Sequence, residues 1–163
     1  MDYDNKSVAV APPGTSARPR RILVVDDEPA ARILAQRLFS EAGFEVQTCS
    51  SGFDCLKDFR ARPRWFDLIL LDLSMPFMDG EETFGRLREI RPDLPVLLST
   101  GFIAQDRLDR MIEAGMAGFL HKPHRPEELV KNIKAILECV KLARAGCAEG
   151  CIGSSFSEKK QPL

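Results

Sequence analysis

The sequence predicts an α/β fold built on a five-stranded parallel sheet, doubly wound in a (βα)5 order. Two observations lead to this fold class. Five short strand-like segments alternate along the chain with five segments of helical periodicity, and the central strand-like segments are continuous apolar runs. Such runs are typical of parallel sheets that are covered by helices on both faces. With 163 residues, 44% of them hydrophobic, the chain is long enough for one domain of this kind.

The strands are predicted at residues 22–25, 44–48, 68–71, 96–98 and 118–120. Residues 44–48 alternate between apolar and polar side chains, which indicates an edge strand with one solvated face. We expect the first helix to have Asp27 as its N-cap and Pro29 in its first turn. Ser50 or Ser51 is expected to cap the second helix. The last three helices are predicted near residues 81–90, around residues 108–112 and from about residue 127 to residue 140.

The two ends of the chain differ from its centre in composition. Residues 11–16 read Ala-Pro-Pro-Gly-Thr-Ser without an apolar period, and the C-terminal end is rich in Gly, Ser, Lys and Glu. Such segments cannot bury enough apolar surface to offset the entropy of ordering. We therefore expect a flexible leader over residues 1–20, one folded domain over 21–142 and a flexible tail over 143–163.

The charge distribution argues against nucleic acid as a partner. The net charge of the chain is −1, but residues 22–140 hold 15 Lys and Arg against 20 Asp and Glu. An acidic domain is a poor electrostatic match for a phosphate backbone. No apolar run approaches the roughly 18 residues that span a bilayer, and no signal-peptide pattern opens the chain. We expect a cytoplasmic protein without membrane insertion. The five cysteines are odd in number and scattered, which does not suggest a disulfide framework.

Acidic and polar side chains follow four of the five predicted strands. Asp26 and Asp27 follow the first strand, Asp72 the third, Thr100 the fourth and Lys122 the fifth. Ligands bind outside the carboxyl ends of such strands, so these side chains should converge. Three carboxylates at close range repel one another unless a cation lies among them, and Mg²⁺ suits a site that also admits a phosphoryl group. A lysine and a hydroxyl would then bind phosphoryl oxygens.

At these positions residues 21–140 resemble the receiver domains of two-component response regulators. The resemblance rests on four motifs: Asp26-Asp27, the run Asp72-Leu73-Ser74-Met75-Pro76-Phe77-Met78-Asp79-Gly80, Thr100-Gly101 and Lys122-Pro123. It implies a flavodoxin-like sheet with the strand order 2-1-3-4-5. It also implies a phosphorylation switch.

The resemblance implies that Asp72 accepts a phosphoryl group from the phosphohistidine of a histidine kinase or a histidine phosphotransfer protein. Asp27, Asp72 and the backbone carbonyl of Ser74 would ligate Mg²⁺, and Asp26 would act through a bound water. A carboxylate is a weak nucleophile, so the transfer depends on in-line positioning and on cations that neutralise the phosphoryl oxygens.

The resemblance also assigns roles around the fourth and fifth strands. Lys122 would contact the phosphoryl group, and the peptide bond before Pro123 is expected to be cis. The Thr100 hydroxyl would move toward the phosphoryl group and let the ring of Phe119 turn inward, which would bias the neighbouring surface. Many family members have Tyr at this position, whereas Phe119 keeps the ring but lacks the hydroxyl.

Two further residues are expected to tune the lifetime of the acyl phosphate, which water hydrolyses. Ser74, two residues after the phospho-acceptor, is small. Phe102, two residues after Thr100, is bulky and is hypothesised to shield the acyl phosphate from water.

Other classes of function fit less well. An aspartate-nucleophile phosphohydrolase would have a second acid two residues after its nucleophile, where this chain has Ser74. A nucleotide-binding site would need a Gly-rich loop after the first strand, where residues 26–28 are all acidic. A binding module that has lost phosphorylation remains an alternative. A zinc site can be built from His121, His124, Cys147 and Cys151, but the last predicted helix separates the two pairs.

The segment after Val140 is too short for a common DNA-binding output domain. We therefore expect a stand-alone receiver, or a receiver similar to those fused to sensor histidine kinases. Its output would be phosphotransfer or docking to a downstream protein target, without transcription. The protein would not be a dedicated enzyme, although slow self-dephosphorylation is expected.

Overall fold

The computed structural model describes residues 18–146. Its five strands are β1 (Arg21–Val25), β2 (Glu45–Cys49), β3 (Leu68–Asp72), β4 (Val96–Thr100) and β5 (Gly118–His121). Its five helices are α1 (Pro29–Glu41), α2 (Gly52–Ala61), α3 (Gly80–Ile90), α4 (Gln105–Glu113) and α5 (Pro126–Arg144). Strand and helix alternate throughout, as predicted.

All strand pairs are parallel, and the order in the sheet is β2-β1-β3-β4-β5. This confirms the fold class and the strand order. The chain reverses its direction of progress along the sheet between β1 and β3, so the carboxyl ends of these two strands adjoin a topological switch point. β2 lies at an edge, and its residues are more exposed than those of β3 and β4.

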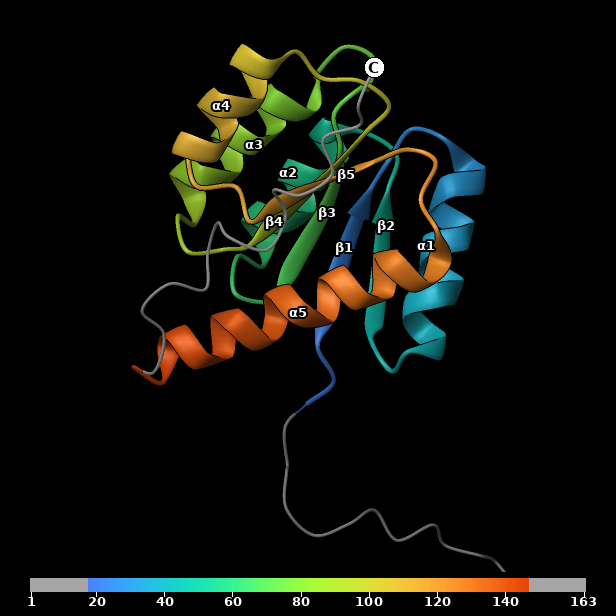
Figure 1. Ribbon diagram of the computed structural model, residues 1–163, viewed down its shortest axis with the longest axis vertical. Helices are drawn as coiled ribbons and strands as arrows, with labels where there is room; N and C mark the ends of the chain where they lie inside the picture. The colour runs from blue at the N-terminus through green and yellow to red at the C-terminus, as the bar shows by residue number, and fades with distance from the viewer. Residues whose placement is uncertain (1–17, 147–163) are drawn as a thin grey trace, which may run out of the picture.

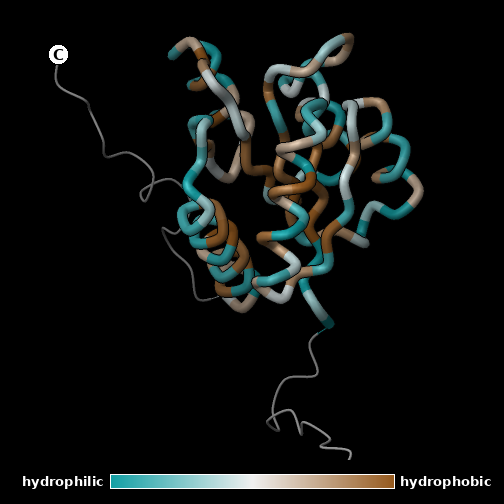
Figure 2. The backbone as a smooth tube through the Cα atoms, turned by 90° about the vertical axis from the view of Figure 1, so that its right-hand side faces the viewer, coloured by the Kyte–Doolittle hydropathy of each residue, from teal (hydrophilic) through white to brown (hydrophobic). Residues whose placement is uncertain are grey.

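Each face of the sheet has its own apolar core, because successive side chains of a strand point to opposite faces. One core joins α1 and α5 to the sheet, and the other joins α2, α3 and α4. Figure 1 shows these two helix layers on either side of the strands. The hydrophobic residues gather in the central strands and on the helix faces that cover them (Figure 2). Packing of the buried strand residues against both helix layers therefore fixes the positions of the strand ends.

The start of α1 differs from the prediction. The N-cap is Glu28, with no side-chain cap hydrogen bond, so the assignment of Asp27 as N-cap is wrong. Pro29 occupies the first helical position because its fixed φ suits that position and its missing N–H costs nothing there, so the residue before it becomes the N-cap. Asp27 is left free for another role. Ser51 does cap α2, where its hydroxyl accepts from the backbone N–H of Asp54.

A few boundaries also differ from the expectation. β2 begins one residue later than predicted, and α5 continues to Arg144, beyond the residue at which we ended the domain. Before β1, the side chains of Arg18 and Arg20 contact the carboxylate of Asp67. Within residues 18–146, no helix is long and apolar enough to cross a membrane.

Candidate functional site

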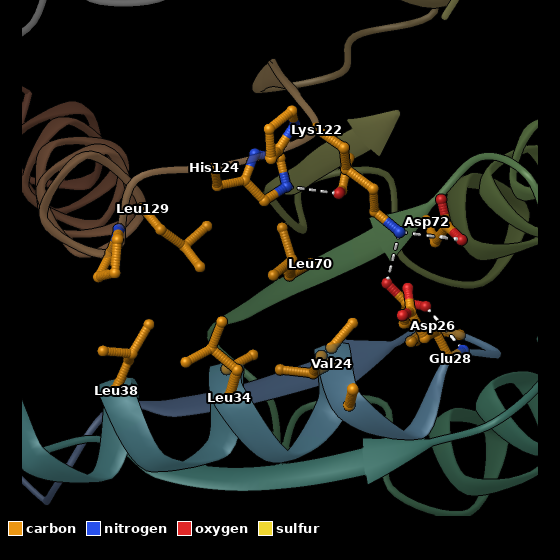
Figure 3. A pocket seen from close by; sticks show the side chains of 17 residues that line it. Val24, Asp26, Glu28, Leu34, Leu38, Leu70, Asp72, Lys122, His124 and Leu129 are labelled. Carbon is orange, nitrogen blue, oxygen red and sulfur yellow. Dashed lines mark hydrogen bonds and ion pairs between the residues drawn. The ribbon is translucent and has the colours of Figure 1, made fainter. Parts of the chain in front are cut away.

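The carboxyl ends of β1, β3 and β5 bring three charged side chains together. The Lys122 Nζ atom lies 2.8 Å from an Asp26 carboxylate oxygen and 3.4 Å from an Asp72 carboxylate oxygen (Figure 3). Asp72 is the last residue of β3, and Asp26 and Lys122 directly follow β1 and β5. All three continue the alternation of the strand residues whose side chains face α1 and α5. The sequence predicted this convergence, and the structure confirms it.

Asp27 joins the same cluster. One carboxylate oxygen from each of Asp26, Asp27 and Asp72 lies within 4.8 Å of the others. Asp26 and Asp72 are buried, whereas Asp27 is exposed at the mouth of the site. Two buried carboxylates and one exposed carboxylate form an oxygen-rich site of the kind that Mg²⁺ prefers.

The environment opposes ionisation of the Asp72 carboxyl. Burial, followed by the nearby charge of Asp26, raises the pKa of Asp72 above its ordinary value, although Lys122 offsets part of this shift. Burial lowers the pKa of Lys122, but its hydrogen bond to Asp26 and the charges of Asp72 and Asp26 outweigh burial, and the pKa is raised overall. Lys122 therefore stays an ammonium and partly compensates the acidic cluster.

Backbone groups hold the acids in place. Asp26 accepts a 2.9 Å hydrogen bond from the backbone N–H of Glu28, and Asp72 accepts a 3.2 Å bond from the backbone N–H of Ser74. The guanidinium of Arg32 donates to the backbone carbonyls of Asp26 and Asp27. The turn after β1 is thus tied both to its own acid and to helix α1.

The expected switch residues lie at the end of β4 and in β5. Thr100 is fully buried, and its hydroxyl donates to the backbone carbonyl of Phe102 at 2.7 Å. Phe119 is half-buried, and its ring meets the ring of His121 edge to face. The side chain of Phe102 is 80% exposed. In this structure the Thr100 hydroxyl is directed to its own loop, and the shielding role of Phe102 stays a prediction.

The peptide bond between Lys122 and Pro123, in the loop after β5, is cis, as expected. The His121/His124 zinc pair does not form a free ligand pair. His124 Nε2 lies 2.7 Å from the hydroxyl of Ser99, so this nitrogen is already engaged. The two cysteines of that alternative, Cys147 and Cys151, lie outside the described residues.

An apolar pocket opens beside the acids, between α1 and α5. Its volume is about 480 Å³, and its walls include Val24, Leu34, Leu70 and Leu129. Asp26, Asp72, Lys122, Ser99 and His124 form its polar end. Figure 3 shows the apolar side chains leading up to the charged cluster.

The sequence alone did not reveal the roles of three residues at this site. Arg32 looked like an ordinary polar residue of a helix, and Ser99 followed the predicted fourth strand without an assigned role. His124 entered only the zinc alternative. The signal for Arg32 was its position one turn after the acidic pair, but Ser99 and His124 meet only through the strand register and the loop reversal.

A parallel sheet in this order, with a buried acidic cluster and a lysine at its carboxyl ends, defines a class of phospho-accepting signalling domains. The comparisons agree. The family described as the response regulator receiver domain matches residues 22–134, and the chain belongs to this family.

Among curated proteins, the response regulator MprA of Mycobacterium ulcerans is 34% identical over 139 residues, which cover 85% of this chain and 58% of that protein. The chain spans about half the length of two other curated relatives, the alkaline phosphatase synthesis regulator PhoP of Bacillus subtilis and MprA of Mycobacterium leprae. A receiver domain protein from Clostridium thermocellum superposes with a TM-score of 0.71 at 27% identity, over 76% of this chain and 98% of that one. The BeF3-activated DrrB receiver domain superposes with a TM-score of 0.65 at 28% identity, over 74% and 98%.

Proposed function

We propose that this receiver domain is switched by phosphorylation of Asp72, which accepts a phosphoryl group from the phosphohistidine of a histidine kinase or a phosphotransfer protein. One observation carries the proposal: the Lys122 ammonium lies between two buried carboxylates, 2.8 Å from that of Asp26 and 3.4 Å from that of Asp72. A buried acid beside a fixed cation, within a cluster of acids, is the constellation that phosphoryl transfer to a carboxylate needs.

The donor set fits Mg²⁺. Three carboxylates against one ammonium leave an excess of two negative charges, which one divalent cation neutralises. Asp27, Asp72 and the carbonyl of Ser74 would hold the ion, and Asp26 would hold one of its waters. When bound, the ion supplies positive charge to the phosphoryl oxygens and relieves the repulsion among the acids.

The chain's own groups prepare the nucleophile. The backbone N–H of Ser74 orients the Asp72 carboxylate by binding one of its oxygens, and Lys122 contacts the other. Asp72 must be ionised to attack phosphorus, and its raised pKa makes the carboxylate more basic than an ordinary one. As the bond to phosphorus forms, the bond to the histidine nitrogen breaks, and Lys122 is placed to meet the charge on the phosphoryl oxygens.

The switch begins at Thr100. In the described structure its hydroxyl donates to the carbonyl of Phe102, so a move toward a phosphoryl oxygen has to break this 2.7 Å bond. The loop that leads into α4 then loses one of its internal contacts. Phe119, which is half-buried and packs against the core beneath α4, is free to follow. These steps couple the chemistry at Asp72 to the surface around α4.

The proposal also covers what the phosphorylated domain acts on. We infer docking to a downstream protein, with nucleic acid excluded as a direct ligand of residues 22–140, because these residues carry more acidic than basic side chains. We also infer slow hydrolysis of the acyl phosphate rather than dedicated catalysis, and action in the cytoplasm.

Incubation of the full chain with acetyl phosphate and Mg²⁺ tests the proposal. Wild type and the control Asp109→Asn, an exposed acid on α4, should incorporate one phosphoryl group, and Asp72→Asn should incorporate none. Intact mass at neutral pH measures the product directly. Incorporation that persists in Asp72→Asn, or none in any protein, would overturn the proposal, and many turnovers of phosphate release per chain would favour the phosphohydrolase alternative.

A further inference from the structure

The chain turns sharply between β5 and α5, and β4 holds this turn at both ends. Before the turn, the backbone N–H of Lys122 donates to the carbonyl of Thr100 at 2.8 Å. After it, the ring of His124 bonds to the hydroxyl of Ser99 at 2.7 Å. The two anchors are consecutive residues of one strand, and the residue between Lys122 and His124 is a proline, which has no N–H to offer.

The two groups of this second anchor suit each other, because a serine hydroxyl can either donate to or accept from a ring nitrogen of histidine. Ser99 is buried, with 3% exposed, so its hydroxyl gains by keeping this partner.

The anchor lies next to the reacting groups. Ser99 pairs in register with Asp72 in the sheet, and Ser99, His124 and Lys122 all line the polar end of the pocket between α1 and α5. Figure 3 shows the ring of His124 turned toward this end, beside the Lys122 side chain. Loss of the His124 bond therefore removes one of the two anchors of the segment that carries the lysine.

We propose that His124 is a positioning residue for phosphoryl transfer, which acts with Ser99 to hold the Lys122 ammonium against the carboxylates of Asp26 and Asp72. This inference rests on the proposed function of Asp72 and adds a residue pair to it. His124 touches neither the acids nor the phosphoryl group in this role. Instead, His124 restricts the positions that the Lys122 ammonium can reach.

The expected size of the effect follows from the geometry of transfer. Misplacement of a reacting or stabilising group by 1 Å can cost up to about a hundredfold in rate. Lys122 keeps its backbone anchor to Thr100 when the second anchor is lost, so we expect a smaller loss, of roughly tenfold. The loss should appear at saturating phosphodonor, because the lysine stabilises the transferred group more than it binds the donor.

The test measures the phosphorylation rate of the full chain with acetyl phosphate over a range of donor concentrations. Ser99→Ala and His124→Phe should each lower the rate at saturation roughly tenfold, and the double variant should be no slower than either single one. His124→Gln keeps an amide that reaches the Ser99 hydroxyl and should restore most of the rate. Arg125→Gln, a change at the exposed neighbouring residue, is the matched control and should react as wild type.

A second measurement does not need phosphorylation. Hydrogen exchange at the backbone N–H of Lys122 should quicken in Ser99→Ala and His124→Phe, and should return toward wild type in His124→Gln. If exchange at Lys122 and the saturating rate both stay within twofold of wild type, the positioning role is wrong, even where Asp72 is phosphorylated. If exchange at Lys122 quickens in the variants but neither wild type nor any variant is phosphorylated, His124 does anchor the segment. In that case the proposed phosphorylation of Asp72 is wrong.

Discussion

Gly80 offers the sharpest test of how the fold supports the phospho-acceptor. A Cβ atom at this position would lie 2.6 Å from the Cα of Leu73, and nearer still to the backbone carbonyl oxygen of Asp72. Ordinary contacts of a Cβ atom begin near 3.4 Å, so Gly80→Ala requires the Leu73 Cα to move by about 0.8 Å and the Asp72 carbonyl oxygen to move farther. Both obstructing atoms belong to the backbone of β3 and the residue after it, and a side-chain rotation cannot relieve the clash.

Overpacking of this kind costs about 1–3 kcal/mol, and we expect Gly80→Ala to lower the free energy of unfolding by that amount. The melting temperature should fall by roughly 4–12 °C for a domain of this size. Urea unfolding followed by the fluorescence of Trp65, the single tryptophan, measures the change. Because the displacement falls on the phospho-acceptor, the phosphorylation rate with acetyl phosphate should also drop by at least about tenfold.

Gly85 is the matched control, because it lies on the same helix, α3, and a Cβ atom added there would meet nothing within 4 Å. Gly85→Ala should stabilise the protein by about 0.5–1 kcal/mol, since alanine loses less backbone entropy than glycine in a helix. Both substitutions replace glycine with alanine, but we expect Gly80→Ala to lower the free energy of unfolding and Gly85→Ala to raise it. A Gly80→Ala protein as stable as wild type would refute the argument from close approach.

Three other substitutions and one labelling experiment have definite expected outcomes. Burial and a neighbouring carboxylate raise the pKa of Asp72 in the folded state, so its ionised form opposes folding; Asp72→Asn should raise the melting temperature at pH 7 without Mg²⁺, and the gain should fade in acid as wild type becomes protonated. Phe39→Ala removes a fully buried ring and should cost about 3–5 kcal/mol in urea unfolding, and a loss below about 1 kcal/mol would contradict the assigned packing. Burial raises the pKa of Cys49 to about 12 and also raises that of Cys55, so both thiols should react with a disulfide reagent only on unfolding, and fast labelling of either in the native protein would argue against its burial. Phe102→Ala should speed hydrolysis of the phosphorylated protein, and an unchanged rate of phosphate release would remove its shielding role.

Much of the fold was predictable because it depends on local patterns. The apolar runs of β1, β3 and β4 are buried on both sides, and no other element type accommodates them in so few residues. The convergence of Asp26, Asp72 and Lys122 followed from parallel strands alone. The error at Asp27 was avoidable in principle, because Pro29 at the first helical position already indicates Glu28 as the N-cap.

What the sequence did not reveal depends on long-range geometry. The pairing of Ser99 with His124 requires the register of β4 against β5 and the reversal after Lys122, neither of which leaves a local pattern. The direction of the Thr100 hydroxyl depends on the shape of one loop. Contacts of this kind join residues whose types are common on any surface, so composition and periodicity do not single them out.

The end of β4 has a consequence for how a signal spreads. Ser99 and Thr100 are neighbours in a strand and therefore point to opposite faces of the sheet. Ser99 shares its face with α1 and α5, and Thr100 shares its face with α2, α3 and α4. A small displacement of this one strand end is thus felt in both helix layers at once, so a partner that contacts either side of the molecule can read the same chemical event.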